Sequence, residues 1–514
     1  MIKLLKKKPS KSLLFYIFSL LLAVGLFIYL RLLKLDHLPV FVDEAIYVRW
    51  AQVMKAEPSL RFLPMSDGKQ PLFMWLLMPL LSYFSDPLIA GRVLSLMAGL
   101  GTLIGLAIFS LLLTHSLTVS AISSLFYSLL PFFVFYQRLS LVDALLAMFG
   151  LWSLLIGYLY IRKPRWDLAM VLGAVLGGGL LTKSPAIFFF AWQPILALFF
   201  FKLPHKNQGK KKRFLALLHL VAGWLLAGLI ALVCYNILRL GPNFSMAGSR
   251  NLDYVFPLSE VITHPFNPLI GNLKSTFSWL WFLFTPPVLL SLVFAFNKQD
   301  RKYVLPLVLI VLLPLLAQAL IAKVYTPRYI LFAVTPLVIV TALGLNALLR
   351  RSQMSALISI PLLLFVFTFF FSYRLVTQPE GFPHLPFQLR HGYLEEWTAG
   401  WGQKEVAQYL IDLEQQGHSI VVGTEGYFGT LPDGLQIYTQ GHSNITVIGV
   451  GQPIVTIPSA LGNTSRENLI FLVVNQSRNL LSPSDLGQLE LVMEFPKPAR
   501  SDGTQEKLLF YRFK

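Results

Sequence analysis

Residues 12–33 read SLLFYIFSLLLAVGLFIYLRLL, a run whose only charged residue is Arg31 near its end. A helix needs about 20 mostly apolar residues to cross a bilayer, so this run predicts a membrane span. A basic tail precedes it, with Lys3, Lys6, Lys7, Lys8 and Lys11. No small-residue cleavage signal follows, and we therefore interpret residues 12–33 as an uncleaved anchor.

Ten more apolar runs follow along the chain: 89–113, 118–136, 140–161, 167–183, 185–201, 214–238, 275–296, 303–321, 329–349 and 355–375. Only 13% of the 514 residues are charged and 55% are hydrophobic, whereas a soluble domain carries about 25% charged residues. This composition excludes an ordinary soluble enzyme, a disordered chain and a fibrous protein. It predicts a polytopic α-helical membrane protein with about eleven transmembrane helices.

The net charge of +18 is unevenly distributed, which argues against a nucleic-acid partner. Residues 1–376 hold 34 Lys and Arg against 11 Asp and Glu, while residues 377–514 hold 9 against 14. The basic residues gather in the N-terminal tail and in the connections 162–166, 202–213, 297–302 and 350–354, which alternate along the predicted spans. By the positive-inside rule these segments are cytoplasmic. We expect a multi-pass protein of the cell membrane with a cytoplasmic N-terminus and an extracytoplasmic C-terminal part.

Three regions follow from this pattern. Residues 1–376 form the transmembrane domain, with 34–88 as an outer loop that contains interfacial helices. Residues 377–402 are rich in Pro, Gly and aromatic residues and are interpreted as a linker. Residues 403–514 predict a small extracytoplasmic α/β domain, with a helix over Lys404–Gln415 and strands at Ser419–Val422, Gln436–Tyr438, Ile445–Val450, Leu469–Val474, Leu489–Glu494 and Leu508–Phe513.

Acidic residues are rare before position 377, so each invites an explanation. Asp43 and Glu44 open a helical stretch on the predicted outer side, where an acidic pair also favours the helix dipole and so permits a simple capping role. Asp143 begins the fourth span at its outer end, and Arg138 is a candidate ion-pair partner for it. A carboxylate at this level can remove a proton from a hydroxyl group.

Cations occur at the same predicted level, namely Lys69, Arg92, Lys183 and Arg328. Taken singly, each of these side chains can simply extend to the membrane interface. Together they predict a site for a negatively charged ligand at the outer membrane surface. His264, on the outer 239–274 loop, is a candidate metal ligand beside the Asp43–Glu44 pair, although its spacing is uninformative. The sequence identifies no cofactor, and it leaves open whether the protein binds a divalent metal ion.

The order of these motifs resembles a known family. Asp43-Glu44 after the first span, Lys69-Gln-Pro-Leu-Phe-Met-Trp75, Gly91-Arg92, Arg138 before Asp143-Ala-Leu-Leu-Ala147, Leu-Thr-Lys183, and Tyr325-Thr-Pro-Arg328-Tyr329 follow one another. This series, over residues 1 to about 375, resembles the GT-C membrane glycosyltransferases, specifically the protein O-mannosyltransferase and aminoarabinose transferase group. The usual Lys-Pro-Pro of that group reads Lys69-Gln70-Pro71 here.

The resemblance implies an enzyme that moves a sugar from a polyprenyl-phosphate donor to an acceptor hydroxyl at the outer face, with inversion. Catalytic roles fall to Asp43 as the base, with Glu44 and Asp143. Donor-phosphate binding falls to Lys69, Arg92, Lys183, Arg328 and Tyr325. Membrane lipids surround the site, and the acceptor is left open among protein, lipid and cell-wall glycan. The alternative is a transporter or flippase of lipid-linked glycans, which the absence of an internal repeat disfavours.

Overall fold

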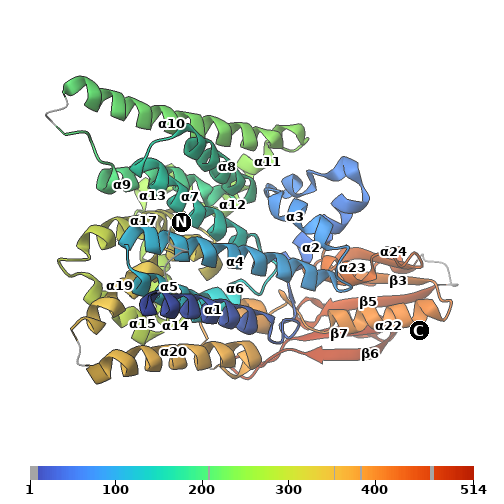
Figure 1. Ribbon diagram of the computed structural model, residues 1–514. Coiled ribbons are helices and arrows are strands. Elements are labelled where there is room, and N and C mark those ends of the chain that lie inside the picture. Colours follow the sequence, from blue (N-terminus) through green and yellow to red (C-terminus); the bar gives the residue numbers. More distant parts are fainter. Residues whose placement is uncertain (1–9, 206–208, 352–353, 383–384, 463–467) are drawn as a thin grey trace.

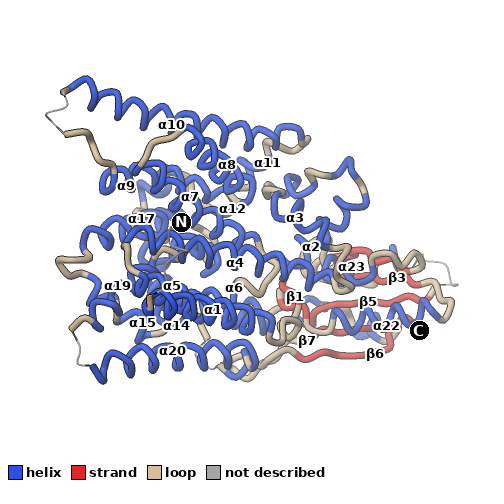
Figure 2. Tube along the Cα trace, viewed as in Figure 1, coloured by secondary structure: helices blue, strands red, loops and turns tan. Residues whose placement is uncertain are grey.

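The computed structural model describes residues 10–205, 209–351, 354–382, 385–462 and 468–514, so the predicted basic tail at Lys3, Lys6, Lys7 and Lys8 lies outside the described residues. A bundle of helices makes up one end of the molecule, and a sheet with its own helices makes up the other (Figure 1). Colouring by secondary structure separates the two parts clearly, because the strands gather at one end (Figure 2).

Within the described residues, six helices are long and apolar enough to span a membrane, or up to eight if each of two bent pairs is one span. The six are α1 (Lys11–Leu32), α4 (Pro87–Thr114), α7 (Val142–Arg162), α10 (Lys210–Asn236), α17 (Arg301–Ile321) and α20 (Met354–Thr377). Three shorter apolar helices are α5 (Leu117–Leu129), α8 (Trp166–Thr182) and α9 (Ile187–Phe200). The prediction of a mostly helical, polytopic membrane protein is confirmed.

Prolines break three of the runs that the sequence predicts as single spans. Residues 118–136 divide at Pro131 into α5 and α6 (Pro131–Tyr136). Residues 275–296 fall on α14 (Leu269–Leu283) and on α15 (Pro286–Leu290) with α16 (Leu292–Ala295), which are bent from α14 by 106°. The third run, residues 329–349, is interrupted at Pro336. Before this proline lie η7 (Pro327–Ile330) and α18 (Leu331–Val334), which are bent by 58° from α19 (Leu337–Leu349). Proline lacks an N–H and its ring collides with the preceding turn, so a continuous helix is not maintained.

Small residues allow α8 and α10 to approach closely. A Cβ on Gly173 would lie 2.7 Å from the carbonyl oxygen of Ala227, and one on Gly177 would lie 2.6 Å from Cβ of Cys234. Glycine at such positions lets two backbones pack against each other inside a membrane. Gly173 and Gly177 therefore serve the packing of α8 against α10.

The loop after α1, which the sequence predicts to be on the outer side, is compact and helical. It contains β1 (Val40–Phe41), α2 (Val42–Ala56), η2 (Pro58–Leu60), η3 (Leu63–Asp67) and α3 (Leu72–Leu80). A second outer segment contains α11 (Met246–Ser249), α12 (Asn251–Tyr254) and α13 (Leu258–Thr263). Helix α2 confirms the predicted helical stretch and lies between the bundle and the C-terminal domain (Figure 1).

The C-terminal domain is a mixed five-stranded sheet in the order β4-β3-β5-β7-β6. Its strands are β3 (Ile420–Glu425), β4 (Ile445–Gly451), β5 (Leu469–Asn475), β6 (Leu489–Pro496) and β7 (Lys507–Phe513). Helix α22 (Gln403–Gln415) buries Val406, Ala407 and Leu410 against one face of this sheet. The predicted strand at Gln436–Tyr438 is wrong, because these residues belong to helix α23 (Asp433–Thr439), which packs on α2.

Residues 377–402, interpreted from sequence as a linker, are folded against the membrane domain where they are described. Strand β2 (Ala399–Gly400) pairs antiparallel with β1, and the ring of Tyr393 lies 4.3 Å from that of Phe41 between centroids. Trp279 of α14 donates a hydrogen bond to Gln388 at 3.0 Å. The Pro/Gly/aromatic composition therefore marks a packed connection that joins both parts next to the start of α2.

Candidate active site

The first turn of α2 carries two adjacent carboxylates with different surroundings. Successive residues of a helix point about 100° apart, so neighbours face different parts of the fold. Asp43 forms an ion pair with Arg328 of η7, and its side chain is 19% exposed. Glu44 is fully buried and forms an ion pair with Arg92 of α4. The two acids that the sequence places side by side thus occupy separate sites.

Glu44 and Arg92 make a closed, buried unit. The guanidinium donates to both carboxylate oxygens at 2.9 Å, and the backbone N–H groups of Ser140 and Phe41 donate to the same carboxylate at 2.6 and 3.1 Å. The three remaining N–H groups of Arg92 donate to the carbonyl oxygens of Leu35, Leu38 and Pro39. A guanidinium has five N–H donors, so none remains for a phosphate. This unit ties α2, α4 and residues 35–41 together.

Asp143 and Lys183 form the second ion pair of the site. Asp143 lies in the first turn of α7, and its Oδ1 is 2.7 Å from Nζ of Lys183, which directly follows α8. The same ammonium lies over the ring of Tyr329, 4.0 Å from its centroid. Asp143 is nearly buried, whereas the lysine side chain is 23% exposed. Lys183 is therefore the member of this pair that a ligand can reach.

Arg138 is not the partner of Asp143, contrary to the sequence-based suggestion. Its guanidinium donates to the carbonyl oxygens of Leu30, Arg31, Leu33 and Lys34, at 2.6 to 3.0 Å. The last carbonyls of a helix have no partner within the helix, and a cation satisfies them well. Arg138 thus caps the end of α1, and the partner of Asp143 comes from α8 instead.

Lys69 reaches the site from the loop before α3. Its Nζ lies 2.7 Å from the hydroxyl of Tyr254 on α12. Gln70, which replaces the usual proline, donates to Oγ of Ser184 at 2.9 Å and so connects this loop to the residue after Lys183. Burial lowers the pKa of Lys69, but the charge of Asp43 and the contact with Tyr254 outweigh it, so the pKa lies above its ordinary value. Lys69 is therefore a stable cation.

Asp43 is held in its ionised form. Burial favours the neutral acid, but Arg328 and Lys69 together outweigh burial and hold the pKa of Asp43 below its ordinary value. Opposite charges within a few ångströms act in this way. Nε of Arg328 is buried and has no hydrogen-bond partner within the described residues. The site therefore contains a charged carboxylate and a guanidinium with a donor to spare.

The remaining candidates lie elsewhere or are already engaged. The hydroxyl of Tyr325 shares a hydrogen bond with Thr276 at 2.8 Å, and its ring packs on Trp279 at 4.9 Å. His264 is exposed, directly after α13. In the described part of the chain, no three His, Cys, Asp or Glu residues gather in a way that could hold a metal.

Four tyrosines belong to the site and were not predicted from the sequence. Tyr254 contacts Lys69, Tyr329 lies under Lys183, and the charges of Asp43 and Arg328 act on Tyr47 and Tyr393. Tyr329 directly follows Arg328 and Tyr47 lies one helical turn after Asp43, so the spacing in the sequence was a usable signal for these two. Tyr254 and Tyr393 come from segments far away in the chain and had no such signal.

Comparison with known proteins agrees with this arrangement. Residues 68–238 match the family described as dolichyl-phosphate-mannose-protein mannosyltransferase. A comparison with curated proteins finds no match. Among solved structures, the chain is similar to ArnT from Cupriavidus metallidurans bound to undecaprenyl phosphate, with 12% identity, a TM-score of 0.59, and coverage of 95% of this chain and 97% of that one. The apo state of the same ArnT gives 14% identity, a TM-score of 0.52 and the same coverage.

These findings confirm the resemblance on which the sequence analysis rests. The ArnT-like fold extends over 95% of the chain. The family match covers residues 68–238, which include Lys69, Asp143 and Lys183. The family match and the ArnT-like fold both agree with the membrane glycosyltransferase that the sequence predicts.

Proposed function

We propose that the chain transfers a sugar from a polyprenyl-phosphate donor to an acceptor hydroxyl at the outer membrane face, with inversion at the sugar. The observation that carries this proposal is the ion pair of Asp43 with Arg328, at a carboxylate on which the charges of Lys69 and Lys183 also act. These residues come from α2, η7, the loop before α3 and the end of α8. One ionised carboxylate among three cations suits a reaction that removes a proton and releases a phosphate. That an ArnT of the same fold binds undecaprenyl phosphate supports the choice of lipid carrier.

Each charged group has a part in the proposed reaction. The acceptor oxygen attacks the anomeric carbon while Asp43 takes its proton. The bond from that carbon to the phosphate oxygen breaks, and the electron pair leaves with the polyprenyl phosphate. Lys69, Lys183 and Arg328 stabilise the charge that develops on this phosphate. Asp143 positions Lys183 through their 2.7 Å contact. Glu44 and Arg92 have no part in the chemistry, because their polar atoms are already engaged.

Arg328 connects donor binding to the base. Its guanidinium pairs with Asp43, while its Nε has no hydrogen-bond partner in the described residues. A donor phosphate that binds this guanidinium competes with Asp43 for it. The carboxylate then becomes available to the acceptor hydroxyl only when the donor is in place. Such an order protects the donor from premature attack by water.

The orientation in the membrane belongs to the same proposal. We place the N-terminus in the cytoplasm and residues 377–514 outside, because the basic connections alternate with the spans. Single cysteines introduced at exposed Lys274 and Gln415, in a variant with Cys234→Ser, would be labelled by a membrane-impermeant reagent added to intact cells. Labelling of both positions only after cell lysis would contradict this orientation.

The transfer itself is tested with the purified protein in lipid vesicles and a panel of polyprenyl-phosphate sugars. We expect release of free polyprenyl phosphate by the wild type and by Asp253→Asn, which alters an exposed outer acid, and none by Asp43→Asn. A product with retained configuration would contradict the direct displacement. If no polyprenyl phosphate is released from any donor, with or without acceptors, the proposal that the protein is a glycosyltransferase is contradicted. Movement of the intact donor across the bilayer would then favour the transporter.

A further inference from the structure

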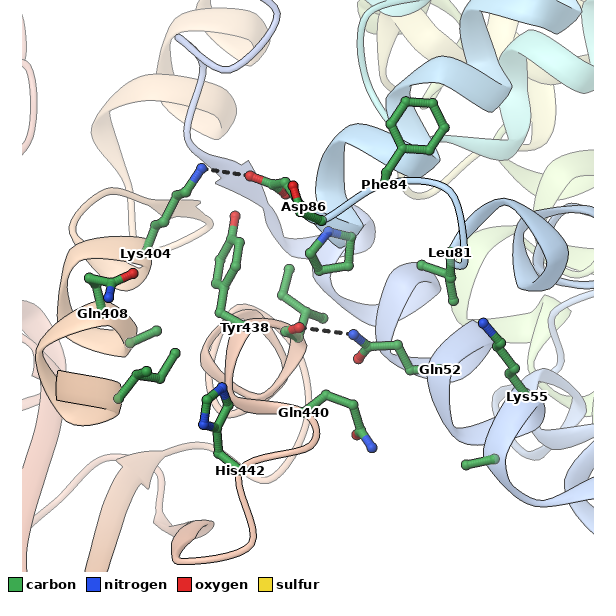
Figure 3. A pocket seen from close by; sticks show the side chains of 16 residues that line it. Gln52, Lys55, Leu81, Phe84, Asp86, Lys404, Gln408, Tyr438, Gln440 and His442 are labelled. Carbon is green, nitrogen blue, oxygen red and sulfur yellow. Dashed lines mark hydrogen bonds and ion pairs between the residues drawn. The ribbon is translucent and has the colours of Figure 1, made fainter. Parts of the chain in front are cut away.

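A cleft of about 720 Å³ separates the start of the membrane domain from the C-terminal domain. Helix α2 and the turn before α4 line one side, and α22, α23 and the residues that follow α23 line the other (Figure 3). A smaller cavity of about 90 Å³ shares Asp86, Lys404 and Tyr438 with it. Clefts of this size between domains are common binding sites for small molecules.

The cleft is separate from the proposed catalytic site. Gln52 lines the cleft and Asp43 belongs to the catalytic site, and both lie on α2, nine residues apart. At 3.6 residues per turn this spacing is close to two and a half turns, with a rise of about 13 Å. The two side chains therefore leave opposite sides of α2. A molecule in the cleft would not touch Asp43.

Two basic side chains of the cleft, Lys404 and His442, are paired with carboxylates. Nζ of Lys404 lies 2.6 Å from Asp86, and Nδ1 of His442 lies 2.5 Å from Glu414. Nζ of Lys55 donates to Oγ of Ser82 at 2.5 Å. An anionic ligand would have to compete with a carboxylate for Lys404 and for His442, and such exchange costs desolvation, whereas Lys55 has only the neutral hydroxyl of Ser82 as its partner in the described residues. A neutral ligand would leave the ion pairs intact.

The other polar groups suit a neutral ligand rich in hydroxyl groups. Gln52, Gln408 and Gln440 contribute amides. One end of each amide is engaged within the protein: Nε2 of Gln408 donates to Asp412, and Oε1 of Gln440 accepts from Arg49. Oε1 of Gln52 is buried without a hydrogen-bond partner in the described residues, although its Nε2 donates to the carbonyl of Ile437. The half-buried ring of Tyr438 stands among these side chains (Figure 3). An aromatic ring with surrounding amides matches the apolar face and the hydroxyl rim of a sugar ring.

We propose that this cleft binds a neutral carbohydrate chain, at a second site apart from the catalytic one. The inference rests on the pairing of Lys404 with Asp86, the three amides and the ring of Tyr438, and it does not depend on the proposed transfer reaction. The carbohydrate would lie between α2 and α22, in contact with both the membrane domain and the C-terminal domain.

Binding is measured on the full-length protein in lipid nanodiscs with neutral tetrasaccharides of glucose, mannose and N-acetylglucosamine. The same tetrasaccharides bearing a phosphate or a carboxylate form the comparison set. We expect at least one neutral chain to bind with a Kd below about 1 mM. Gln408→Trp fills the cleft from an exposed position of α22 and should weaken binding at least about tenfold. Gln415→Trp, also exposed on α22 but outside the cleft, should not.

Asp43→Asn should bind the same carbohydrate as tightly as the wild type does. The binding test is therefore independent of whether the proposed transfer reaction is correct. Three results would overturn the proposal: no neutral chain bound, tighter binding of the anionic chains, or equal binding by Gln408→Trp and the wild type. Binding that survives in Gln408→Trp but is lost in Asp43→Asn would point to the catalytic site instead.

Discussion

The two adjacent acids of α2 should respond in opposite ways to removal of their charge. Asp43→Asn alters a carboxylate that is partly exposed and paired with Arg328. Glu44→Gln alters a fully buried carboxylate that accepts two hydrogen bonds from Arg92 and one each from Ser140 and Phe41. The two changes are chemically equivalent and lie one residue apart. Any difference between them therefore reports their surroundings.

The expected magnitudes follow from these contacts. Breaking a buried ion pair by removing one charge costs about 3–5 kcal/mol, because the other charge stays buried without compensation. Glu44→Gln leaves the buried guanidinium of Arg92 without a counter-charge. It also replaces one carboxylate oxygen, which accepts a hydrogen bond from a backbone N–H group, by an NH₂ group that can only donate. Asp43→Asn also removes the counter-charge of a buried guanidinium, that of Arg328, but it keeps an oxygen for this group at a partly exposed position, so it should cost less stability than Glu44→Gln. Loss of a general base lowers the rate by about 10²–10⁴-fold.

The assay combines thermal unfolding in lipid nanodiscs with release of polyprenyl phosphate by the same samples. Asp43→Asn should unfold near the wild-type temperature and lose at least about 100-fold in turnover. Glu44→Gln should unfold at a clearly lower temperature, and its folded fraction at low temperature should retain turnover within about tenfold of the wild type. Normal stability of Glu44→Gln together with lost turnover would refute the structural role, and full turnover of Asp43→Asn would refute the base.

Three further predictions concern charge. Because Lys69 and Arg328 hold the pKa of Asp43 below its ordinary value, the base stays ionised and kcat/KM should be flat from about pH 8 down to about pH 5; an acid limb near neutrality would contradict this. Lys69→Met should lower kcat by about 10²-fold by removing one stabilising cation, whereas Lys274→Met at an exposed position should not; kinetics with the donor compare the two. Burial raises the pKa of Asp433 from 3.8 to about 6, so the folded protein binds more protons between these values and wild-type stability falls as pH rises through them. Asp433→Asn should therefore unfold at a higher temperature than the wild type at about pH 8, and the difference should shrink as pH falls below about 6.

The sequence locates the apolar helices well because hydropathy is a local property, although six to eight of the described helices, rather than the predicted eleven, are long and apolar enough to span a membrane. Every predicted span falls on helix, and the deviations occur at prolines such as Pro131 and Pro286. Proline effects depend on neighbours that re-satisfy the backbone, which a single run of residues does not contain. The strand expected at Gln436–Tyr438 failed for a related reason, since three residues with strand propensity formed a helix where α2 provides its packing surface.

The candidate site was predicted as a set of charges but not as a set of pairs. Position along the predicted spans placed Asp43, Lys69, Lys183 and Arg328 at one level, and the ion pairs of Asp43 and Asp143 agree with that. Which cation meets which acid depends on how helices rotate about their axes, and the sequence does not contain that rotation. Arg138 therefore looked like a partner of Asp143, although its guanidinium turns toward the end of α1.

Residues 377–402 change the view of the chain as two separable modules. Strand β2 supplies the only pairing that the structure describes for β1, which leads directly into Asp43. Tyr393 packs on Phe41 at 4.3 Å and on Phe135 at 5.3 Å, and the side chain of Phe41 also lies under Arg328. A chain that stopped after residue 376 would lose these contacts and release the start of α2. The segment that connects the C-terminal domain thus helps to hold Asp43 beside Arg328.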